Sequence, residues 1–391
     1  MTTKKQTLKC PRINFLKFIN RSMQLNYLLN NIKYNISYLN KNISKIDKDI
    51  NQMKSDKKIL FLFDENISKK IVNKILAQLK NSGCDVYQIE FLGSKKNKNL
   101  KAVLKIIDFL ISKGFTRKSI ILSLGGGVLG DLSALAASLY MRGLLYMHIP
   151  TTITSMVDSC IGGKTAINYQ GIINSIGTYY HPHRVYLLND IIKELPDREF
   201  YSGLPEILKC GLIKDKSILD IMEKQTKKIN IKEPNITRLL CFKSLKTKIF
   251  FFKNDVFEQN ERLMLNFGHT FAHAIEMAVA KNVEKKTEIL RHGEAVGIGM
   301  LCEIKYANNL KMPLTYKKTK KILELYNLPT NLKFLSCNKF KLQNDIFKFL
   351  FLDKKRIGRF PRYINLRYLG KPKIAEMSDF NKINHIINGI L

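Results

Sequence analysis

The chain has 391 residues, with 66 lysines and arginines against 32 aspartates and glutamates, and a formal net charge of +34. This length exceeds what one hydrophobic core usually fills, so two domains are expected. The 7 cysteines show no CxxC spacing, which argues against a disulfide framework or a cysteine zinc site and favours a reducing, cytoplasmic setting. No run of about 18 apolar residues occurs, and no apolar segment follows the basic N-terminus, so secretion and membrane insertion are not expected.

The positive charge is spread along the chain and is not gathered into one stripe. Residues 40–58, "NKNISKIDKDINQMKSDKK", mix lysine with asparagine, isoleucine and aspartate. A nucleic-acid site would need clustered lysine and arginine to follow the phosphates. Compositional drift is therefore favoured over a specific nucleic-acid site, and only non-specific binding at low salt is expected.

Residues 1–30 are expected to form a basic, irregular extension, and alternating strands and helices follow it. The expected strands cover 57–67, 84–92 and 118–131, and the expected helices between them cover 68–83 and 98–115. This alternation predicts a mostly parallel sheet in an α/β domain over residues 31–188. The pattern then becomes helical, which predicts an all-α second domain over residues 189–391.

A glycine-rich turn follows the third of these strands. Residues 125–131, "GGGVLGD", satisfy GxGxxG with Gly125, Gly127 and Gly130, a pattern that lets backbone N–H groups approach a pyrophosphate. The acid that dehydrogenases place about 20 residues further on is missing. Asp64, at the end of the first expected strand, is the better candidate to bind a ribose hydroxyl. The alternative is a turn that only packs a helix on a strand.

Two of the seven histidines lie four positions apart in "LMLNFGHTFAHAIE", residues 263–276. At this spacing His269 and His273 share one face of a helix, where they can converge on one cation or flank a bound substrate. Alternatively, one is a surface histidine and the other a hydrogen-bonded core histidine. The spacing alone does not decide between these interpretations.

Charged residues also interrupt two stretches of apolar or small residues. Asp158 and Lys164 lie in residues 149–168, and Glu206 and Lys209 lie in "GLPEILKCG", residues 203–211. An unpaired charge is costly to bury, so such residues are usually paired or functional. Ordinary ion pairs remain the alternative for both pairs of residues.

Together these segments resemble the 3-dehydroquinate synthases of the sugar phosphate cyclase family. The resemblance runs from about residue 34 to about residue 370. It rests on five motifs in the family's order and at about its separations, namely "GGGVLGDLSALAASLYMRG", "IPTTITSMVDSCIGGKTAIN", "LPDREFYSGLPEILKCGLIKD", "LNFGHTFAHAIE" and "RHGEAVGIGM".

The resemblance implies an N-terminal NAD-binding domain and a C-terminal helical domain that carries a divalent metal, with the active site between them. It implies that Glu206, His269 and His292 bind the metal, whereas His273 contacts substrate. One oxygen and two nitrogen ligands suit zinc or cobalt. The implied reaction converts 3-deoxy-arabino-heptulosonate 7-phosphate into 3-dehydroquinate and phosphate, with NAD used catalytically.

The resemblance also assigns the remaining site residues. Asp158, Lys164, Lys209 and His273 are the implied catalytic residues. Implied substrate contacts are Arg142, Asn174, Lys248, Arg262, Asn266 and Lys355. Lys164, Asn174 and His273 are expected near the phosphate, and Lys248 and Arg262 near the carboxylate. Implied cofactor contacts are Asp64, Asn66, Gly126, Gly127, Val128, Asp131, Thr151, Thr152 and Lys164. The family further suggests a homodimer.

The chain departs from the family pattern at three places. Ile173 stands where a lysine typically touches the cofactor, and Lys95 stands where a glutamate is usual, although Lys98 is kept. Pro205 replaces the usual alanine just before the metal glutamate, which the first turn of a helix would tolerate. The first two changes put the affinity for NAD in doubt.

Three other functions remain as alternatives. A related cyclase that uses another sugar phosphate tends to vary at Lys248, Asn266 and Lys355, which here match dehydroquinate synthase. An iron-dependent or glycerol-phosphate dehydrogenase shares the distant fold but would lack "VDSCIGGKTAIN". A catalytically dead chain retained as a nucleic-acid binder would show salt-dependent binding.

Overall fold

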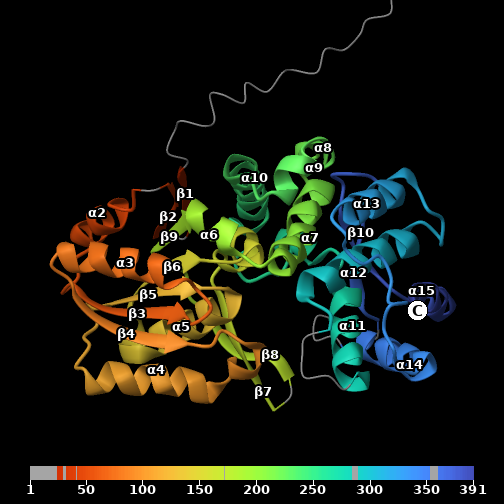
Figure 1. Cartoon of the computed structure of the whole chain (residues 1–391). Helices are drawn as coiled ribbons and strands as arrows, with labels where there is room; N and C mark the ends of the chain where they lie inside the picture. The colour runs from red at the N-terminus through yellow and green to blue at the C-terminus, as the bar shows by residue number, and fades with distance from the viewer. Residues whose placement is uncertain (1–23, 30–31, 41, 171, 284–288, 353–359) are drawn as a thin grey trace, which may run out of the picture.

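The computed structural model describes residues 24–29, 32–40, 42–170, 172–283, 289–352 and 360–391 (Figure 1). Its N-terminal part is built on a seven-stranded sheet with the strand order β1-β2-β9-β6-β5-β3-β4. The strands are β1 (Gln24–Leu29), β2 (Ile32–Leu39), β3 (Lys58–Asp64), β4 (Asp85–Phe91), β5 (Ile120–Gly125), β6 (Leu145–Pro150) and β9 (Arg184–Leu188). All neighbours pair in parallel except β1 and β2, so the expected mostly parallel α/β sheet is confirmed.

Helices cover both faces of this sheet, which explains why its strands are apolar throughout. Along β3, Ile59, Phe61 and Phe63 join one buried cluster, and the alternate residues Leu60 and Leu62 join the other. Side chains of a strand alternate between faces, and a parallel sheet is normally covered on both. The helices of this part are α2 (Lys45–Gln52) and α3 (Lys69–Asn81) over one face, and α4 (Leu100–Ser112) and α5 (Gly127–Leu139) over the other (Figure 1).

The N-terminal extension differs from the expectation at its end. Residues 24–29 form β1, which pairs antiparallel with β2 through a register that joins Gln24 to Ser37 and Leu29 to Ile32. The expectation of an irregular segment up to residue 30 is therefore wrong for β1, because these residues gain backbone hydrogen bonds at the sheet edge. Residues 1–23 lie outside the described residues.

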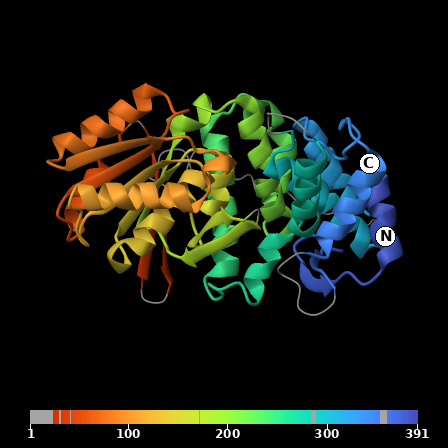
Figure 2. The same cartoon turned by 90° about the horizontal axis from the view of Figure 1, so that it is seen from below.

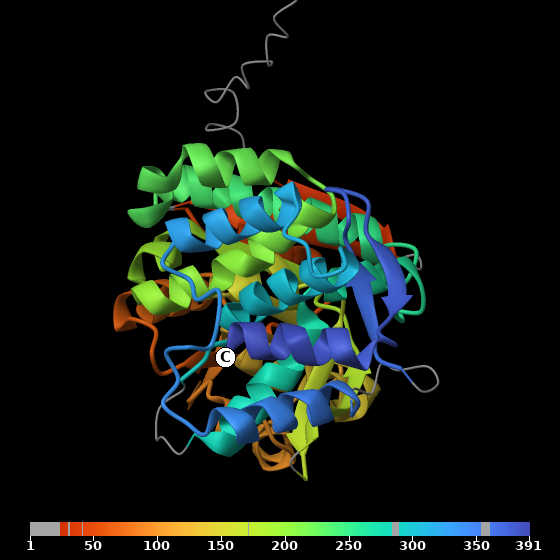
Figure 3. The ribbon, with the colours of Figure 1, turned by 90° about the vertical axis from the view of Figure 1, so that its right-hand side faces the viewer.

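The part after β9 is helical, as expected, apart from one small ribbon. Strands β10 (Arg362–Asn365) and β11 (Lys373–Glu376) form an antiparallel pair that the helical pattern did not reveal; Figure 3 shows it beside the helices. The helices are α6 (Asn189–Glu194), α7 (Asp197–Ile213), α8 (Ser217–Lys224), α9 (Thr226–Asn230), α10 (Pro234–Phe252), α11 (His269–Asn282), α12 (His292–Ala307), α13 (Leu314–Leu325), α14 (Lys339–Leu350) and α15 (Phe380–Ile390).

One continuous core joins the two parts into an elongated molecule. The larger apolar cluster includes Ile59 of β3, Leu208 of α7 and Phe271 of α11. Figure 2 shows the sheet at one end of the molecule and the C-terminal helices at the other. A separate hairpin, β7 (Lys164–Tyr169) with β8 (Ile172–Tyr179), lies between them. No helix in the described ranges is long and apolar enough to span a membrane.

Candidate active site

Three helices bring a carboxylate and two imidazoles together. Glu206 lies in α7, His269 is the first residue of α11 and His292 is the first residue of α12. Their ligand atoms all lie within 4.8 Å of one another. The Nε2 atoms of His269 and His292 are 3.5 and 3.7 Å from Oε1 of Glu206. This is the donor set of a three-ligand site for zinc or a similar cation.

Glycines next to the histidines allow this close approach. Gly268 has φ +84°, and a Cβ on it would lie 2.6 Å from Cγ of Met300 in α12. A Cβ on Gly293 would lie 1.6 Å from the carbonyl oxygen of Ser202 in α7. Any larger residue at either position would push α12 away from its neighbours. The glycines in "FGH" and "HGE" therefore set the spacing of the metal ligands.

Neighbouring groups fix the orientation of each candidate ligand. The Nζ of Lys209 is 2.5 Å from Oε2 of Glu206, and both side chains are buried. The other carboxylate oxygen, Oε1, faces the two histidines and has no hydrogen-bond partner among the described residues. A buried, unsatisfied carboxylate oxygen between two imidazoles fits a bound divalent cation.

The two histidines are each held through Nδ1. Nδ1 of His292 is 3.0 Å from Oε2 of Glu276, and Nδ1 of His269 is 3.2 Å from the carbonyl oxygen of Phe267. These contacts aim both Nε2 atoms at Glu206. Burial would raise the pKa of Glu276, but His292 outweighs it and lowers that pKa to about 2.

His273 lies one helical turn beyond His269 and outside the Glu206 cluster. Its ring centroid is 5.5 Å from that of His269 and 6.2 Å from that of His292. The pair at i and i+4 is therefore divided, with one histidine in the cluster and the other beside it. The spacing had left open whether both would face one cation.

A group of charged residues adjoins the cluster. Lys248 of α10 approaches Asp158, with its Nζ 2.8 Å from Oδ1, and it also donates to the Asp158 carbonyl oxygen. Burial would raise the pKa of Asp158, but Lys248 and then Lys209 outweigh it and hold that pKa well below its ordinary value. Burial likewise opposes the charge of Lys209, yet Glu206 and Asp158 raise its pKa. The charged residues of the two apolar stretches, residues 149–168 and 203–211, thus meet beside the metal cluster.

Glu258 is a candidate site residue that the sequence interpretation missed. It accepts a hydrogen bond from Nδ2 of Asn266 at 2.7 Å and pairs with Lys164. Two expected substrate contacts therefore converge on this one carboxylate. Glu258 lies in a polar loop, where a charged residue gives no signal by hydrophobic pattern, although its φ of +60° marks an unusual backbone.

Arg262 is nearly inaccessible, with 2% of its surface exposed. Its guanidinium donates to the carbonyl oxygens of Gly162, at 2.9 Å, and of Val256. It thus holds the turn that precedes Lys164. Its expected contact with a substrate carboxylate stays a prediction.

The expected cofactor residues gather at the carboxyl ends of β3, β5 and β6. Asp64 ends β3, and its Oδ1 accepts hydrogen bonds from the backbone and the side chain of Asn66 at 3.1 and 2.9 Å. Gly126 caps α5, and Gly127 and Val128 open it. Thr151 follows β6 and bonds to the carbonyl oxygen of Gly125, and Thr152 comes next. Ligands of open α/β sheets usually bind at this edge.

Lys98 ties this edge to the hairpin. Its Nζ is 2.5 Å from Oδ2 of Asp131 and 2.6 Å from Oδ1 of Asn174. Ile173, the replacement for the usual lysine, is 55% exposed on β8. Lys95, the replacement for the usual glutamate, has its Nζ 3.3 Å from Oε1 of Glu276. It thus contacts the carboxylate that orients His292.

Of the expected substrate contacts, Arg142 is not brought to this site. Arg142 ends a short turn (η2, Tyr140–Arg142) just before β6, so it lies at the opposite end of that strand from Thr151. Lys355 lies outside the described residues. The order of the elements explains the first result, because α5 carries the chain back from the carboxyl edge of the sheet to its amino edge.

Comparisons with known proteins identify the family of this chain. Residues 88–202 match the family described as 3-dehydroquinate synthase N-terminal, and residues 203–356 match 3-dehydroquinate synthase C-terminal. The 3-dehydroquinate synthase of Prochlorococcus marinus subsp. pastoris is 34% identical over 338 residues, which is 85% of this chain and 88% of the relative.

Solved structures show the same fold. A 2-deoxy-scyllo-inosose synthase complexed with carbaglucose-6-phosphate, NAD+ and Co2+ has a TM-score of 0.82 at 24% identity, covering 94% of this chain and 100% of that one. The 2-epi-5-epi-valiolone synthase of Streptomyces hygroscopicus, with NAD+ and Zn2+ bound, has a TM-score of 0.80 at 22% identity, covering 93% and 98%. The chain therefore belongs to the 3-dehydroquinate synthase family of enzymes, which are lyases.

Proposed function

We propose that the chain converts 3-deoxy-arabino-heptulosonate 7-phosphate into 3-dehydroquinate and phosphate. The observation that carries the proposal is the Glu206, His269 and His292 cluster, which lies beside the paired charges of Asp158 and Lys248. Zinc or cobalt would be held by this cluster, and NAD at the carboxyl edge of the sheet. When bound, the cation would acidify a substrate hydroxyl and NAD would accept hydride from that carbon.

The chain's own residues bind and orient the substrate. A phosphate and a carboxylate on one small molecule need several fixed cations. Lys164, Asn174 and His273 are the proposed phosphate contacts, and Lys248 and Arg262 the proposed carboxylate contacts. In the structure Lys164 is paired with Glu258 and Lys248 with Asp158, so entering anions compete with these carboxylates for the two lysines.

Lys209 and Asp158 have complementary tasks in this proposal. Lys209 holds one oxygen of Glu206, so the other oxygen stays directed at the cation site. Asp158 stays ionised and can accept a hydrogen bond from a substrate hydroxyl. Because both side chains are preorganised, little reorganisation accompanies substrate binding.

We further propose two domains, residues 31–188 and 189–391, and a cytoplasmic homodimer. The support for the dimer is an exposed apolar surface on the hairpin, where Ile172, Ile173, Ile176 and Tyr179 are 38 to 55% exposed. Exposed apolar side chains such as these are typical of interfaces. In this dimer Arg142, which its own site cannot use, would serve the site of the second copy.

Mixed dimers test the assignment of Arg142. Arg142→Ala and Glu206→Gln should each lose activity when alone. Co-expressed with different tags and purified as the mixed species, the two variants should regain activity, because one of the two sites then has both residues intact. No recovery in the mixed dimer would mean that Arg142 acts in its own chain or not at all.

The proposed reaction is tested by incubating the purified chain with the heptulosonate phosphate, zinc or cobalt, and a range of NAD concentrations. Release of phosphate together with the mass of 3-dehydroquinate, abolished by a chelator, is the expected result. The rival is a related cyclase with another sugar phosphate. It is distinguished by release of phosphate from that sugar phosphate and not from the heptulosonate.

A further inference from the structure

A buried polar chain lies behind the glycine turn, at positions to which neither the motifs nor the reaction assigns a role. His148 of β6 is 2% exposed. Its Nδ1 is 2.7 Å from the hydroxyl of Ser123 in β5, and this hydroxyl is 3.0 Å from the hydroxyl of Tyr146. The Tyr146 hydroxyl donates to the carbonyl oxygen of Gly130 at 3.1 Å. This series of hydrogen bonds thus runs from α5 through two strands to His148.

Counting hydrogens along this chain fixes the tautomer of His148. Tyr146 has one hydroxyl hydrogen, which the Gly130 carbonyl takes, so the contact between Tyr146 and Ser123 needs the hydrogen of Ser123. Ser123 then has no hydrogen left for His148, and Nδ1 of His148 must donate to it. Because burial lowers the pKa of His148 to about 4, the ring is neutral at pH 7. Its Nε2 is therefore a bare acceptor.

Nε2 of His148 has no hydrogen-bond partner among the described residues, and it faces α5 at Gly130. A Cβ on Gly130 would lie 3.1 Å from Nε2 of His148, so a larger residue at this position would push the imidazole aside by a few tenths of an ångström. A buried acceptor without a donor loses its hydrogen bonds to water without replacement, which is unfavourable. A donor for this nitrogen is accordingly expected nearby.

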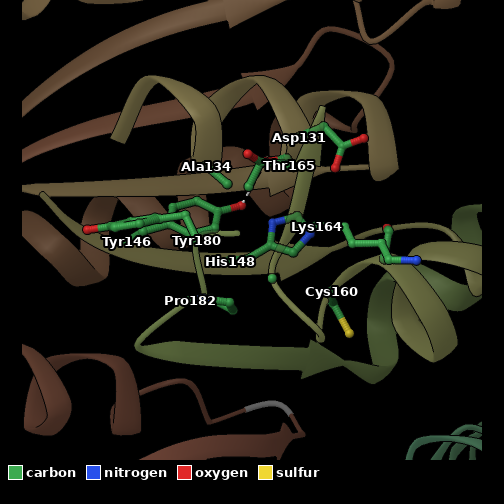
Figure 4. Close-up of a pocket in the computed structure, with 12 residues that line it drawn as sticks. Asp131, Ala134, Tyr146, His148, Cys160, Lys164, Thr165, Tyr180 and Pro182 are labelled. Carbon is green, nitrogen blue, oxygen red and sulfur yellow. Dashed lines mark hydrogen bonds between the residues drawn. The ribbon is translucent and has the colours of Figure 1, made fainter. Parts of the chain in front are cut away.

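A small cavity beside His148 has room for that donor. Its volume is about 10 Å³, and Asp131, Ser159 and Lys164 are among the residues that line it. Figure 4 shows the His148 imidazole among the lining residues, with Asp131 and Lys164 to the right of it. A volume of this size holds about one water molecule, and a buried water needs two to four polar partners. The polar residues of the lining include His148, Ser159 and Thr165.

We propose that the cavity binds a single water molecule that donates to His148 Nε2, and that His148 thereby positions the turn that begins α5. Through this water and through Tyr146, the polar chain holds α5 at Gly130 and at Asp131. Asp131, Gly126 and Gly127 are proposed cofactor contacts, so this inference rests on the proposed NAD site. His148 itself is a positioning residue and does not touch NAD.

Two amide substitutions test the roles of the two nitrogens of His148 one at a time. The amide of His148→Asn reaches the place of Nδ1 and keeps the bond to Ser123, but it removes the acceptor at the cavity. The amide of His148→Gln reaches the place of Nε2 and keeps that acceptor. His385→Asn, at an exposed position of α15, is the matched control.

Binding is measured by the rise in NADH fluorescence on titration with protein. His148→Asn should weaken NADH binding about tenfold, the equivalent of one lost hydrogen bond, and His148→Gln less than about threefold. His385→Asn should bind as the wild type does. Equal binding by all four proteins, or an equal loss in both His148 variants, would overturn the positioning role.

The water is tested separately, because failure of the NAD site must be told apart from failure of this inference. A crystal structure near atomic resolution should show one water within hydrogen-bond distance of His148 Nε2 in the wild type and in His148→Gln. Absence of that density in the wild type would overturn the proposal. Failure of the wild type to bind NADH, with the water present, would instead overturn the proposed cofactor.

Discussion

Replacing Lys209 with methionine should expose how strongly the metal cluster depends on its buried ion pair. The Nζ of Lys209 lies 2.5 Å from Glu206, and the two side chains are 3% and 1% exposed. Methionine has a similar volume and no charge, so it would leave Glu206 as an uncompensated buried carboxylate. Removing one partner of a buried pair typically costs about 3 to 5 kcal/mol, and we expect a loss of this size in the metal-stripped chain.

A cation should recover much of that loss. Zinc in the Glu206, His269 and His292 cluster would supply the positive charge that Lys209 no longer provides, so the variant should gain more stability from zinc than the wild type does. The measurement is urea unfolding of the chelator-treated protein, repeated at saturating zinc.

The matched control is Lys243→Met. Lys243 pairs with Asp215 at 3.0 Å, but the two side chains are 22% and 31% exposed, and pairs this accessible are worth about 0 to 1 kcal/mol. If Lys209→Met without metal were no less stable than Lys243→Met, or if zinc left their difference unchanged, the assigned role of Lys209 would be wrong.

Three further substitutions test the carboxylate that orients His292, the buried His148 and the edge of the sheet proposed to bind the cofactor. Glu276→Gln removes the carboxylate that orients His292, so zinc affinity, measured by competition with a chromophoric chelator, should fall about 10- to 100-fold; an unchanged affinity would contradict that role. Burial lowers the pKa of His148 from 6.5 to about 4, so between these pH values the unfolded chain binds a proton that the native chain does not, and stability should fall as the pH drops. His148→Gln should remove about 3 kcal/mol of that fall in urea unfolding followed from pH 7 to pH 4, and parallel curves would refute the assignment. Ile173→Lys should tighten NADH binding about tenfold, whereas Ile172→Lys, on the opposite face of β8, should not; equal effects would point to net charge alone.

The sequence predicted the α/β architecture and its parallel sheet because the apolar runs and glycine stops mark each element locally. The metal cluster was predicted residue by residue through the family motifs, whereas the histidine spacing alone left two interpretations open. The spacing could not separate His269 from His273, because their division depends on where α7 and α12 lie, and no periodicity within α11 contains that information.

Other features depend on contacts that no local pattern encodes. Glu258 becomes a site residue only because Lys164 and Asn266 converge on it. Strands β1, β10 and β11 are only four to six residues long and mix polar with apolar side chains, so their signal comes from the partner strand and not from their own sequence. Arg142 is a predicted substrate contact. Only the direction of α5 shows that it lies at the amino edge of the sheet, away from the candidate site of its own chain.

Lys95 shows that a departure from the family pattern can acquire a new contact. It stands where a glutamate is usual on the cofactor side, yet its Nζ is 3.3 Å from Oε1 of Glu276, whose Oε2 holds His292. A short helical turn of the α/β part (η1, Lys95–Asn97) is thereby linked to the metal cluster on the helical part. Because the Lys95 side chain is 60% exposed, the pair is worth at most about 1 kcal/mol. A link this weak cannot hold the two parts together by itself, and the continuous apolar core that they share does so instead.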